Sequence, residues 1–314
     1  MNILVTAIGS FSADCVINTL KKHKHFVVGC DIYPSEWHAV SKDCNKVYKV
    51  PFATKENDYI DSLITICKQD NIEYVFPLTD LEIDVLNKKR EIFENNGIIL
   101  CIQSSQCLDI ARNKYKIHFM FENDSIVNVP KTIYSNEITE AFSLPAIGKP
   151  INGRSSEGVE KIYCLDELIR LKKKDNYLIQ EYLEGNIYTV DYVRNSLTGQ
   201  DFSIPREELL RTKNGAGTTV RIVPDKQLNE IVSYIGNKLG INGCVNMEFI
   251  YHANKYYLID INPRFSAGVA FSNFIGYDMV SAHLNCFTNN INLPQPIKFE
   301  EQILCKRYKE ERLM

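Results

Sequence analysis

Residues 246–264 read Asn246-Met-Glu-Phe-Ile-Tyr-His-Ala-Asn-Lys-Tyr-Tyr-Leu-Ile-Asp-Ile-Asn-Pro-Arg264. Apolar and aromatic residues flank a short polar turn, which predicts two antiparallel strands joined as a hairpin. Asp260 and Asn262 are two residues apart, so on a strand their side chains point to one face. Glu248 joins them only if it lies opposite Asp260. That register requires a turn with an odd number of residues, such as 253–255, because an even turn would put Glu248 on the wrong face.

This arrangement predicts a magnesium site. Carboxylate and amide oxygens on a rigid sheet are the ligands that Mg²⁺ prefers, and the ion keeps some of its waters while it bridges substrate phosphates. We expect Glu248, Asp260 and Asn262 to hold the metal. The hairpin alone fits a set of solvent-facing strand residues equally well, so residues outside it have to decide between the two interpretations.

The first hundred residues alternate between apolar runs and amphipathic segments. The expected strands are 2–8, 26–32, 74–78 and 98–102, and the expected helices are 13–22, 59–69 and 84–95. This alternation predicts a parallel, doubly wound, Rossmann-like sheet. A dinucleotide site is not expected, because its fingerprint needs three spaced glycines and only Gly9 is present, although Asp31 ends the second strand where a ribose would lie.

Beyond residue 104 the pattern changes. A helix is expected over 105–121, and residues 146–184 read as strand, Gly-rich turn, strand, helix and strand, a small α+β module. Long strands dominate from residue 188 onward, and their expected ranges are 188–194, 218–222, 245–251 and 256–261, with a helix over 225–239. We therefore expect three units, 1–104, 105–185 and 186–314.

The composition is that of an ordinary globular protein. Of the 314 residues, 45% are hydrophobic and 24% are charged, and the formal net charge is −3. This balance excludes disordered and collagen-like classes and gives no electrostatic reason to expect nucleic acid as a partner. No apolar stretch reaches the ~18 residues of a membrane span and no basic leader is present, so we expect a cytoplasmic protein without membrane contact. The ten cysteines are scattered and are expected to be free thiols.

The acids of the hairpin and the Pro-Arg that follows them are typical of one family. Glu248 on one strand, followed by Asp260-Ile-Asn262-Pro-Arg264 on the next, resembles the ATP-grasp superfamily and, within it, the carbamoyl-phosphate-synthase-like carboxylate-amine ligases. The resemblance covers nearly the whole chain. It implies an α/β N-terminal Rossmann-like (pre-ATP-grasp) domain, then an α+β ATP-grasp lid and a C-terminal metal- and substrate-binding domain. It also implies ATP and a pair of Mg²⁺ ions as cofactors, with Mn²⁺ as an alternative metal.

The resemblance further implies residues that hold the phosphates of ATP. Lys149 matches the family's strand lysine, and Lys114 matches a second phosphate lysine just before the lid. Ser155 and Ser156 lie within residues 152–158, which resemble the loop that covers the phosphates. Taken alone, this glycine- and serine-containing stretch reads as an ordinary hairpin turn.

Residues 178–191 resemble the family's adenine-binding connector between lid and main domain. The residues expected to contact the adenosine are Gln180, Glu181, Leu183 and Glu184. Of these, Gln180 and two backbone groups are expected to read the adenine edge. Many family members carry a glutamate for the ribose hydroxyls where this chain has Ile187, so Glu184 is expected to take over that contact.

Residues 204–221 form a basic, glycine-containing stretch that resembles the family's substrate loop. Arg211 and Lys213 in this stretch, together with Arg264, are expected to neutralise the γ-phosphate and a developing acyl phosphate. The other interpretation is a set of surface cations on a loop. Residues 265–276 are rich in small residues and are expected either to line the substrate pocket or to form a helix-packing turn.

The resemblance implies a two-step reaction. A substrate carboxylate attacks the γ-phosphate of Mg-ATP, and an amine or thiol then displaces phosphate from the acyl phosphate. The expected partners are a small carboxylate and an amine, and a homodimer is left open. No general base is evident, and Glu207, Glu208 and the substrate itself are the alternatives. Two other functions also stay open: an ATP-binding regulatory or scaffold subunit without turnover, favoured by Ile187, and a carboxylase or carboxylate kinase of the same fold.

Overall fold

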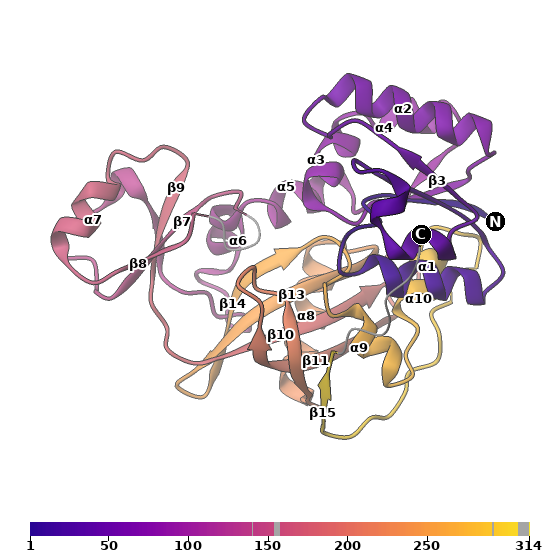
Figure 1. Ribbon diagram of the computed structural model, residues 1–314. Coiled ribbons are helices and arrows are strands. Elements are labelled where there is room, and N and C mark those ends of the chain that lie inside the picture. The colour runs from indigo at the N-terminus through magenta and orange to yellow at the C-terminus, as the bar shows by residue number, and fades with distance from the viewer. Residues whose placement is uncertain (140, 154–157, 291, 307–313) are drawn as a thin grey trace.

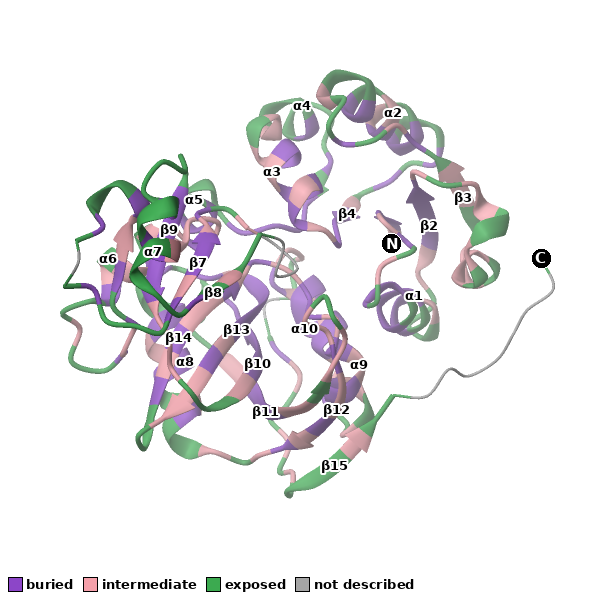
Figure 2. Ribbon diagram, turned by 60° about the vertical axis from the view of Figure 1, so that its left-hand side comes forward, coloured by how far each residue is buried: buried purple, intermediate pink, exposed green. Residues whose placement is uncertain are grey.

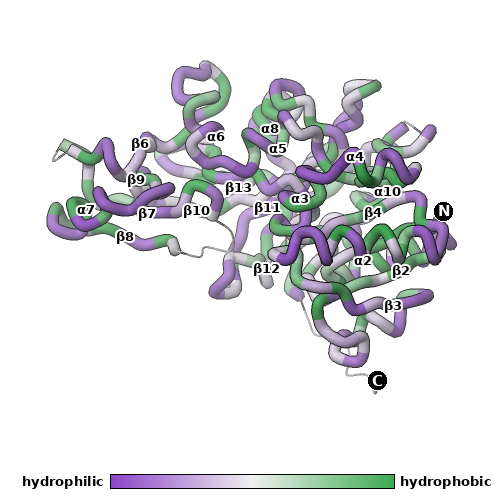
Figure 3. The backbone as a smooth tube through the Cα atoms, turned by 90° about the horizontal axis from the view of Figure 1, so that it is seen from above, coloured by the Kyte–Doolittle hydropathy of each residue, from purple (hydrophilic) through white to green (hydrophobic). Residues whose placement is uncertain are grey.

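The computed structural model of the chain describes residues 1–139, 141–153, 158–290, 292–306 and 314. It contains three β-sheets, which we call the N-terminal, lid and C-terminal sheets in chain order. The C-terminal sheet lies between the other two (Figures 1 and 3). Within the described ranges, no helix combines the length and apolar character of a transmembrane segment.

The N-terminal sheet is parallel, with the strand order β3-β2-β1-β4-β5. Its strands are β1 Asn2–Val5, β2 Phe26–Asp31, β3 Lys46–Lys49, β4 Tyr74–Phe76 and β5 Ile99–Leu100, and its helices are α1 Ala13–Lys22, α2 Glu56–Gln69, α3 Asp80–Lys88 and α4 Arg90–Glu94. The apolar residues of β1 are buried on both faces of the sheet, as in other parallel sheets covered by helices. The predicted Rossmann-like sheet is confirmed, although the half-exposed edge strand β3 was not among the expected strands.

One expected helix of this unit, 84–95, is wrong in its extent. The structure has two shorter helices there, separated at Lys89. The first begins at Asp80, because Thr79 and Glu82 form a capping box in which side chains satisfy the free backbone N–H groups of the first turn.

The expected helix over 105–121 is also two helices, α5 Ser105–Ala111 and α6 Lys114–Phe121. Asn113 between them has an extended backbone, and its side-chain oxygen accepts hydrogen bonds of 3.0 Å from two backbone N–H groups in the first turn of α6. The new N-cap therefore starts a second helix, with Lys114 at its first position.

The lid sheet is small and antiparallel, with the order β6-β9-β7-β8. Its strands are β6 Thr132–Tyr134, β7 Ala146–Pro150, β8 Glu160–Ile162 and β9 Tyr177–Glu181, and its helix is α7 Leu165–Leu171. Leu168 and Leu171 of α7 are fully buried against the sheet. They belong to a hydrophobic core that is separate from the cores of the other two sheets. The predicted order of elements over 146–184 agrees with this arrangement.

The C-terminal sheet is antiparallel, with the order β14-β13-β10-β11-β12-β15. Its strands are β10 Asn186–Arg194, β11 Asp201–Arg211, β12 Gly217–Ile222, β13 Gly243–His252, β14 Lys255–Asn262 and β15 Gln302–Cys305, and its helices are α8 Lys226–Lys238, α9 Val269–Phe274 and α10 Met279–Asn285. This sheet presents the metal-site hairpin.

The loop expected from residue 204 onward is wrong for residues 204–211, which belong to β11. This strand pairs with both β10 and β12. Arg206, which a loop would expose, is only 1% exposed and forms ion pairs with Asp191 at 2.8 Å and Glu208 at 3.1 Å. Charged residues occupy buried positions of this strand. The alternation of apolar and polar residues that ordinarily predicts a strand is therefore missing here.

The hairpin of β13 and β14 has the expected pairing but a different turn. Glu248 lies opposite Asp260, as the metal-site prediction requires. The turn, however, contains two residues, Ala253 and Asn254, both with positive φ of 46° and 61°. A one-residue bulge at Ile259 restores the register, so the requirement for an odd turn was wrong: two turn residues and one bulge residue together supply the odd number.

The N-terminal and C-terminal sheets share a hydrophobic core. Residues of β1 and α1 belong to the same buried cluster as residues of β10 to β13, α9 and α10, and Figure 2 shows the buried faces of α9 and α10 beneath the N-terminal unit. At the rim of this interface His23 lies 2.8 Å from Asp278. The loops after β1 and β4 are thereby fixed above the metal-site hairpin.

Candidate active site

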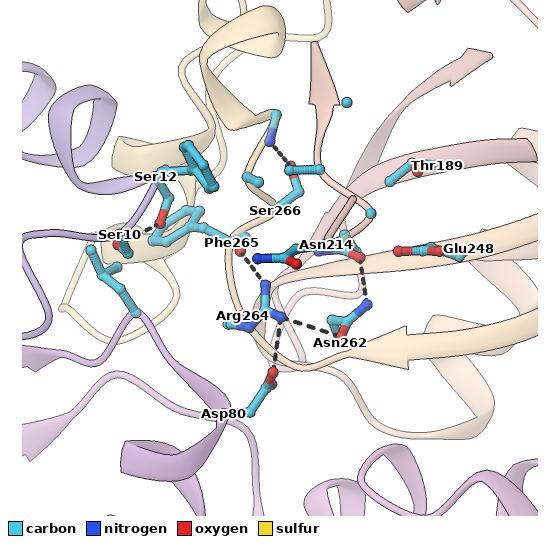
Figure 4. Close-up of a pocket in the computed structure, with 18 of the residues that line it drawn as sticks. Ser10, Ser12, Asp80, Thr189, Asn214, Glu248, Asn262, Arg264, Phe265 and Ser266 are labelled. Atoms are coloured by element: carbon cyan, nitrogen blue, oxygen red, sulfur yellow. Dashed lines mark hydrogen bonds and ion pairs between the residues drawn. The ribbon is translucent and has the colours of Figure 1, made fainter. Parts of the chain in front are cut away.

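The candidate site is a row of polar side chains across one face of the C-terminal sheet. Asp260 pairs with Glu248, Glu248 with Thr189, and Thr189 with Arg206, across four neighbouring strands. Directly opposed residues of antiparallel strands share a face, so these side chains lie side by side. In the next row Asn262 donates a hydrogen bond of 2.9 Å to the side chain of Asn246 (Figure 4).

Two cations pair with the two carboxylates of the row. The ammonium of Lys114 lies 2.8 Å from both oxygens of Asp260. The guanidinium of Arg211 donates to Glu248 at 3.1 Å. Burial raises the pKa of Glu248, although Arg211 opposes the shift. Lys114 and Arg211, far apart in the sequence, are thus brought to the two predicted metal ligands.

The donor set fits magnesium better than a softer metal. Two carboxylates and one amide on a single sheet face are hard oxygen donors. Within the described ranges, no group of three His, Cys, Asp or Glu side chains is arranged to hold a metal. Glu248, Asp260 and Asn262 would therefore leave coordination positions for water and phosphate oxygens.

Arg264 connects the metal strand to the N-terminal unit. Its guanidinium donates to the carboxylate of Asp80 at 2.8 Å and to the carbonyl oxygen of Phe265 at 3.1 Å (Figure 4). Burial raises the pKa of Asp80, but the charges of Arg264 and Arg112 outweigh it and hold the pKa below its usual value. Sequence reasoning missed Asp80. The available signal was an acid at the first position of a helix that directly follows a parallel strand, because loops at the carboxyl ends of such strands build sites.

Lys149 lies inside the lid sheet with Gln180. Its ammonium donates to the Gln180 side-chain oxygen at 2.9 Å, and the Gln180 amide donates to Thr132 at 2.8 Å. Burial, with help from the charge of Lys114, lowers the pKa of Lys149 to about 7. A polyphosphate nearby would restore its positive charge. The Gln180 side chain, expected at the adenine edge, uses its oxygen and its amide within the lid.

The remaining expected nucleotide residues lie along and after β9. The side chain of Glu181 accepts from the backbone N–H of Lys131 at 2.8 Å. Leu183 is half-buried and Glu184 is exposed, with the Glu184 carbonyl 2.8 Å from Nδ1 of His252. Ser155 and Ser156 fall outside the described residues.

A cavity of about 560 Å³ adjoins the row and separates it from the N-terminal loops. The residues that line it come from 9–12 after β1, from 78–81 after β4, from Thr189 on β10, from positions 206, 208, 211 and 214–217, and from the metal strands with residues 264–268. Lys213, expected to act on the phosphates, is exposed and absent from this lining, while its neighbour Asn214 is part of it. Residues 264–268 do line the cavity, as expected for part of the segment 265–276.

Comparison with known proteins identifies the fold and family. Residues 111–268, half of the chain, match the sequence model of the ATP-grasp domain. The chain belongs to the ATP-grasp family. Residues 3–101 of this ATP-grasp protein also match the PylC-like N-terminal domain. The superfamily and fold predicted from the sequence are confirmed, and the cofactors of this family are ATP and Mg²⁺.

Two curated relatives are similar to parts of this ATP-grasp protein. The carbamoyl phosphate synthase large chain of Clostridium acetobutylicum is 24% identical over 275 residues, covering 79% of this chain and 25% of that one. The tyramine–L-glutamate ligase of Methanocaldococcus jannaschii is 26% identical over 219 residues, covering 68% of this chain and 63% of that one. The chain thus spans less than two thirds of the length of either relative.

A solved structure shows the same fold over almost the whole chain. The beta-gamma-ATP complex of biotin carboxylase from Campylobacter jejuni superposes with a TM-score of 0.78 at 15% identity, covering 93% of this chain and 72% of that one.

Proposed function

We propose that the protein is an ATP-dependent carboxylate-amine ligase that works through an acyl phosphate. The observation that carries this proposal is the row of Glu248 and Asp260 with its two cations, beside a cavity that Arg264, just past the end of the metal strand, also lines. A site that only stored a nucleotide would not need three arginines, Arg206, Arg211 and Arg264, along the cavity that its metal ligands line.

The residues have separate roles in this proposal. Glu248, Asp260 and Asn262 would hold Mg²⁺, which would supply charge neutralisation for the phosphates of ATP. Lys114 and Lys149 would hold the phosphates in line, and Arg211 would neutralise the transferred phosphoryl group. Arg264, held by Asp80 at 2.8 Å, would orient the substrate carboxylate. The lid would exclude water that would otherwise hydrolyse the acyl phosphate.

Glu208 is a better candidate than Glu207 for the residue that holds the amine substrate and accepts its proton. Glu207 is occupied by Asn186 at 2.7 Å and by Arg221 at 3.1 Å. The side chain of Glu208 is 2% exposed and lines the cavity, and its Oε2 has no hydrogen-bond partner among the described residues. A buried carboxylate oxygen without a partner is suited to hold an ammonium group and to accept its proton.

The rival function is an ATP-binding subunit without turnover. Ile187, where many members carry a ribose-binding glutamate, lies on β10 opposite Ile250 and offers no polar group. A carboxylase or carboxylate kinase of the same fold would form ADP with the acid alone. The assay has to separate these reactions.

The test is an ADP-formation screen of amino acids and other small carboxylic acids, each with and without a panel of amines. The proposal predicts ADP formation that requires both acid and amine. Asp260→Ala should abolish it, whereas Asp166→Ala, an exposed acid on α7, should leave it unchanged. ATP binding with no turnover on any pair would support the rival, and amine-independent turnover would support a carboxylase or kinase. We further propose a cytoplasmic location, because all ten cysteines are free thiols.

A further inference from the structure

A second cavity of about 300 Å³ lies in the N-terminal unit, at the carboxyl ends of β1, β2 and β4. The residues that line it are Ala7, Gly9, Ser10, Asp31, Ile32, Tyr33, His38, Phe52, Ala53, Tyr59, Thr79, Leu81 and Glu82. Four of them, Gly9, Ser10, Thr79 and Leu81, also line the cavity of the candidate active site. We call the second cavity the side pocket, because this shared wall joins it to the site.

The carboxylates of the side pocket are already occupied. Asp31 accepts hydrogen bonds from the backbone N–H groups of Gly9 at 2.9 Å and Tyr33 at 3.1 Å. Glu82 accepts from the hydroxyls of Tyr59 at 2.9 Å and Thr79 at 2.7 Å. A polar group of a ligand would find no free carboxylate here to accept its hydrogen bond. Burying a polar group without a hydrogen-bond partner is unfavourable.

The most exposed side chains of the wall are aromatic. Tyr33 and Phe52 line the pocket and are 47% and 53% exposed. Trp37, 68% exposed, stacks on Tyr33 with ring centroids 5.6 Å apart. The two exposed aromatic side chains of the lining, Tyr33 and Phe52, gain free energy when an apolar ligand covers them, and Trp37 reports on the environment of Tyr33 through their stacking.

The side pocket is not a dinucleotide site. A Cβ atom added at Gly9 would lie 2.7 Å from the ring carbon Cε1 of His38, so the imidazole covers the glycine. A pyrophosphate would need to approach the backbone at that position. A volume of about 300 Å³ is also at the lower end of ligand pockets, which suits one ring or a branched aliphatic group.

We propose that the side pocket binds an aryl or bulky apolar group carried by the amine substrate. This rests on the proposed ligase function. The acid has to lie beside the metal ligands, where its carboxylate meets the γ-phosphate. Ser10 and Thr79 line both the active-site cavity and the side pocket, so an amine that reaches the acyl carbon past them has the side pocket beside it. Its substituent then points into the side pocket.

Binding can be measured without turnover, because Trp37 is the only tryptophan of the chain. Its emission, followed on the full-length protein, should change saturably with 2-phenylethylamine and much less with n-propylamine, which carries the same amino group without the ring. Tyr33→Ala and Phe52→Ala should each weaken 2-phenylethylamine binding about tenfold or more. Both side chains are about half exposed, so their loss leaves the core intact.

Phe274→Ala is the matched control, because Phe274 is 76% exposed on α9 and lines neither cavity. It should bind 2-phenylethylamine as the unchanged protein does. Equal responses to both amines, or full binding by Tyr33→Ala and Phe52→Ala, would overturn the side-pocket proposal.

Turnover adds a second, separate test. In the ligase assay, Phe52→Ala should raise KM for aryl amines about tenfold while KM for small aliphatic amines and for the acid stays the same. A KM change confined to the acid would overturn the assignment to the amine. If no acid-amine pair gives turnover, the ligase function fails, and the fluorescence titration still decides whether the pocket binds the ring.

Discussion

The ammonium of Lys114 lies 2.8 Å from both carboxylate oxygens of Asp260, the central predicted metal ligand. Arg211 is held in the same way by Glu248 at 3.1 Å. Both cations are also the groups expected to meet phosphate. We infer an exchange of partners: when Mg-ATP binds, the acids turn to the metal and the cations turn to the phosphates. In the structure the opposite charges on this sheet face compensate one another.

This exchange predicts that Lys114→Met raises the affinity for the metal ion and lowers the affinity for ATP. Without the ammonium, Asp260 is free, so the nucleotide-free protein should bind Mn²⁺ about tenfold more tightly. ATP binding should weaken, because a phosphate contact is lost. Electron paramagnetic resonance of Mn²⁺ measures the first effect, and calorimetry with ATP measures the second.

Lys116→Met is the control for this variant. Lys116 lies on the same helix and pairs with exposed Asp109 at 2.6 Å, away from the row. It should leave both affinities unchanged. Weaker Mn²⁺ binding by Lys114→Met would contradict the exchange.

The ion pair of Arg264 with Asp80 predicts that the N-terminal unit positions the Arg264 guanidinium for catalysis. Asp80→Asn removes the charge that holds Arg264 but keeps the shape of the side chain. We expect kcat to fall about ten- to a hundredfold with KM for ATP nearly unchanged, because the guanidinium loses its orientation toward the substrate. Asp84→Asn removes an ion pair with Arg112 at 3.0 Å and does not touch Arg264. It should retain kcat, and an equal loss in both variants would contradict the role of Asp80.

Features that depend on a local pattern of residues could be predicted from the sequence. Apolar runs predicted the parallel sheet, and the spacing of Asp260 and Asn262 predicted their common face. The register of Glu248 was correct although the turn was not, because a bulge at Ile259 has no signature in residue type.

Features that depend on distant partners were not predictable in this way. β11 was missed because Arg206 is buried by pairing with Asp191 and Glu208, and no local pattern reports such partners. Asp80 contacts Arg264 from 184 positions earlier in the chain. Folding brings these residues together, and a pattern in one segment cannot show which segment lies opposite.

The turn of the metal hairpin predicts a stabilising substitution. Ala253 and Asn254 both have positive φ, as in the turns that prefer Asn-Gly. Ala253→Asn combined with Asn254→Gly should raise the free energy of unfolding by about 1 kcal/mol, because alanine is unfavourable in the left-handed region. Urea unfolding measures the change. Activity should be unaffected, since both residues are exposed and lie at the far end of the hairpin from Glu248. Ala253→Val should instead destabilise the protein.

His283 predicts a pH dependence of the interface between the N-terminal and C-terminal sheets. Its Nδ1 accepts from the backbone N–H of Cys244 at 2.8 Å, and its Nε2 lies 3.2 Å from the carbonyl oxygen of Cys101. Both contacts are satisfied only by the neutral ring with the proton on Nε2. Burial lowers the pKa of His283 to about 4, below its ordinary value of 6.5.

Between these two pKa values the unfolded chain binds the proton and the folded chain does not, so stability present above pH 6.5 is lost as the pH falls toward 4. For His283 alone, the loss between pH 7 and pH 4 should be about 3 kcal/mol. Urea unfolding at both pH values measures it.

His283→Gln should be less stable at pH 7 but should lose about 3 kcal/mol less on acidification, because its side chain does not titrate. His252→Gln, a substitution at the hairpin turn, should lose as much as the unchanged protein. Equal losses in His283→Gln and the unchanged protein would mean that the interface accepts the charged ring.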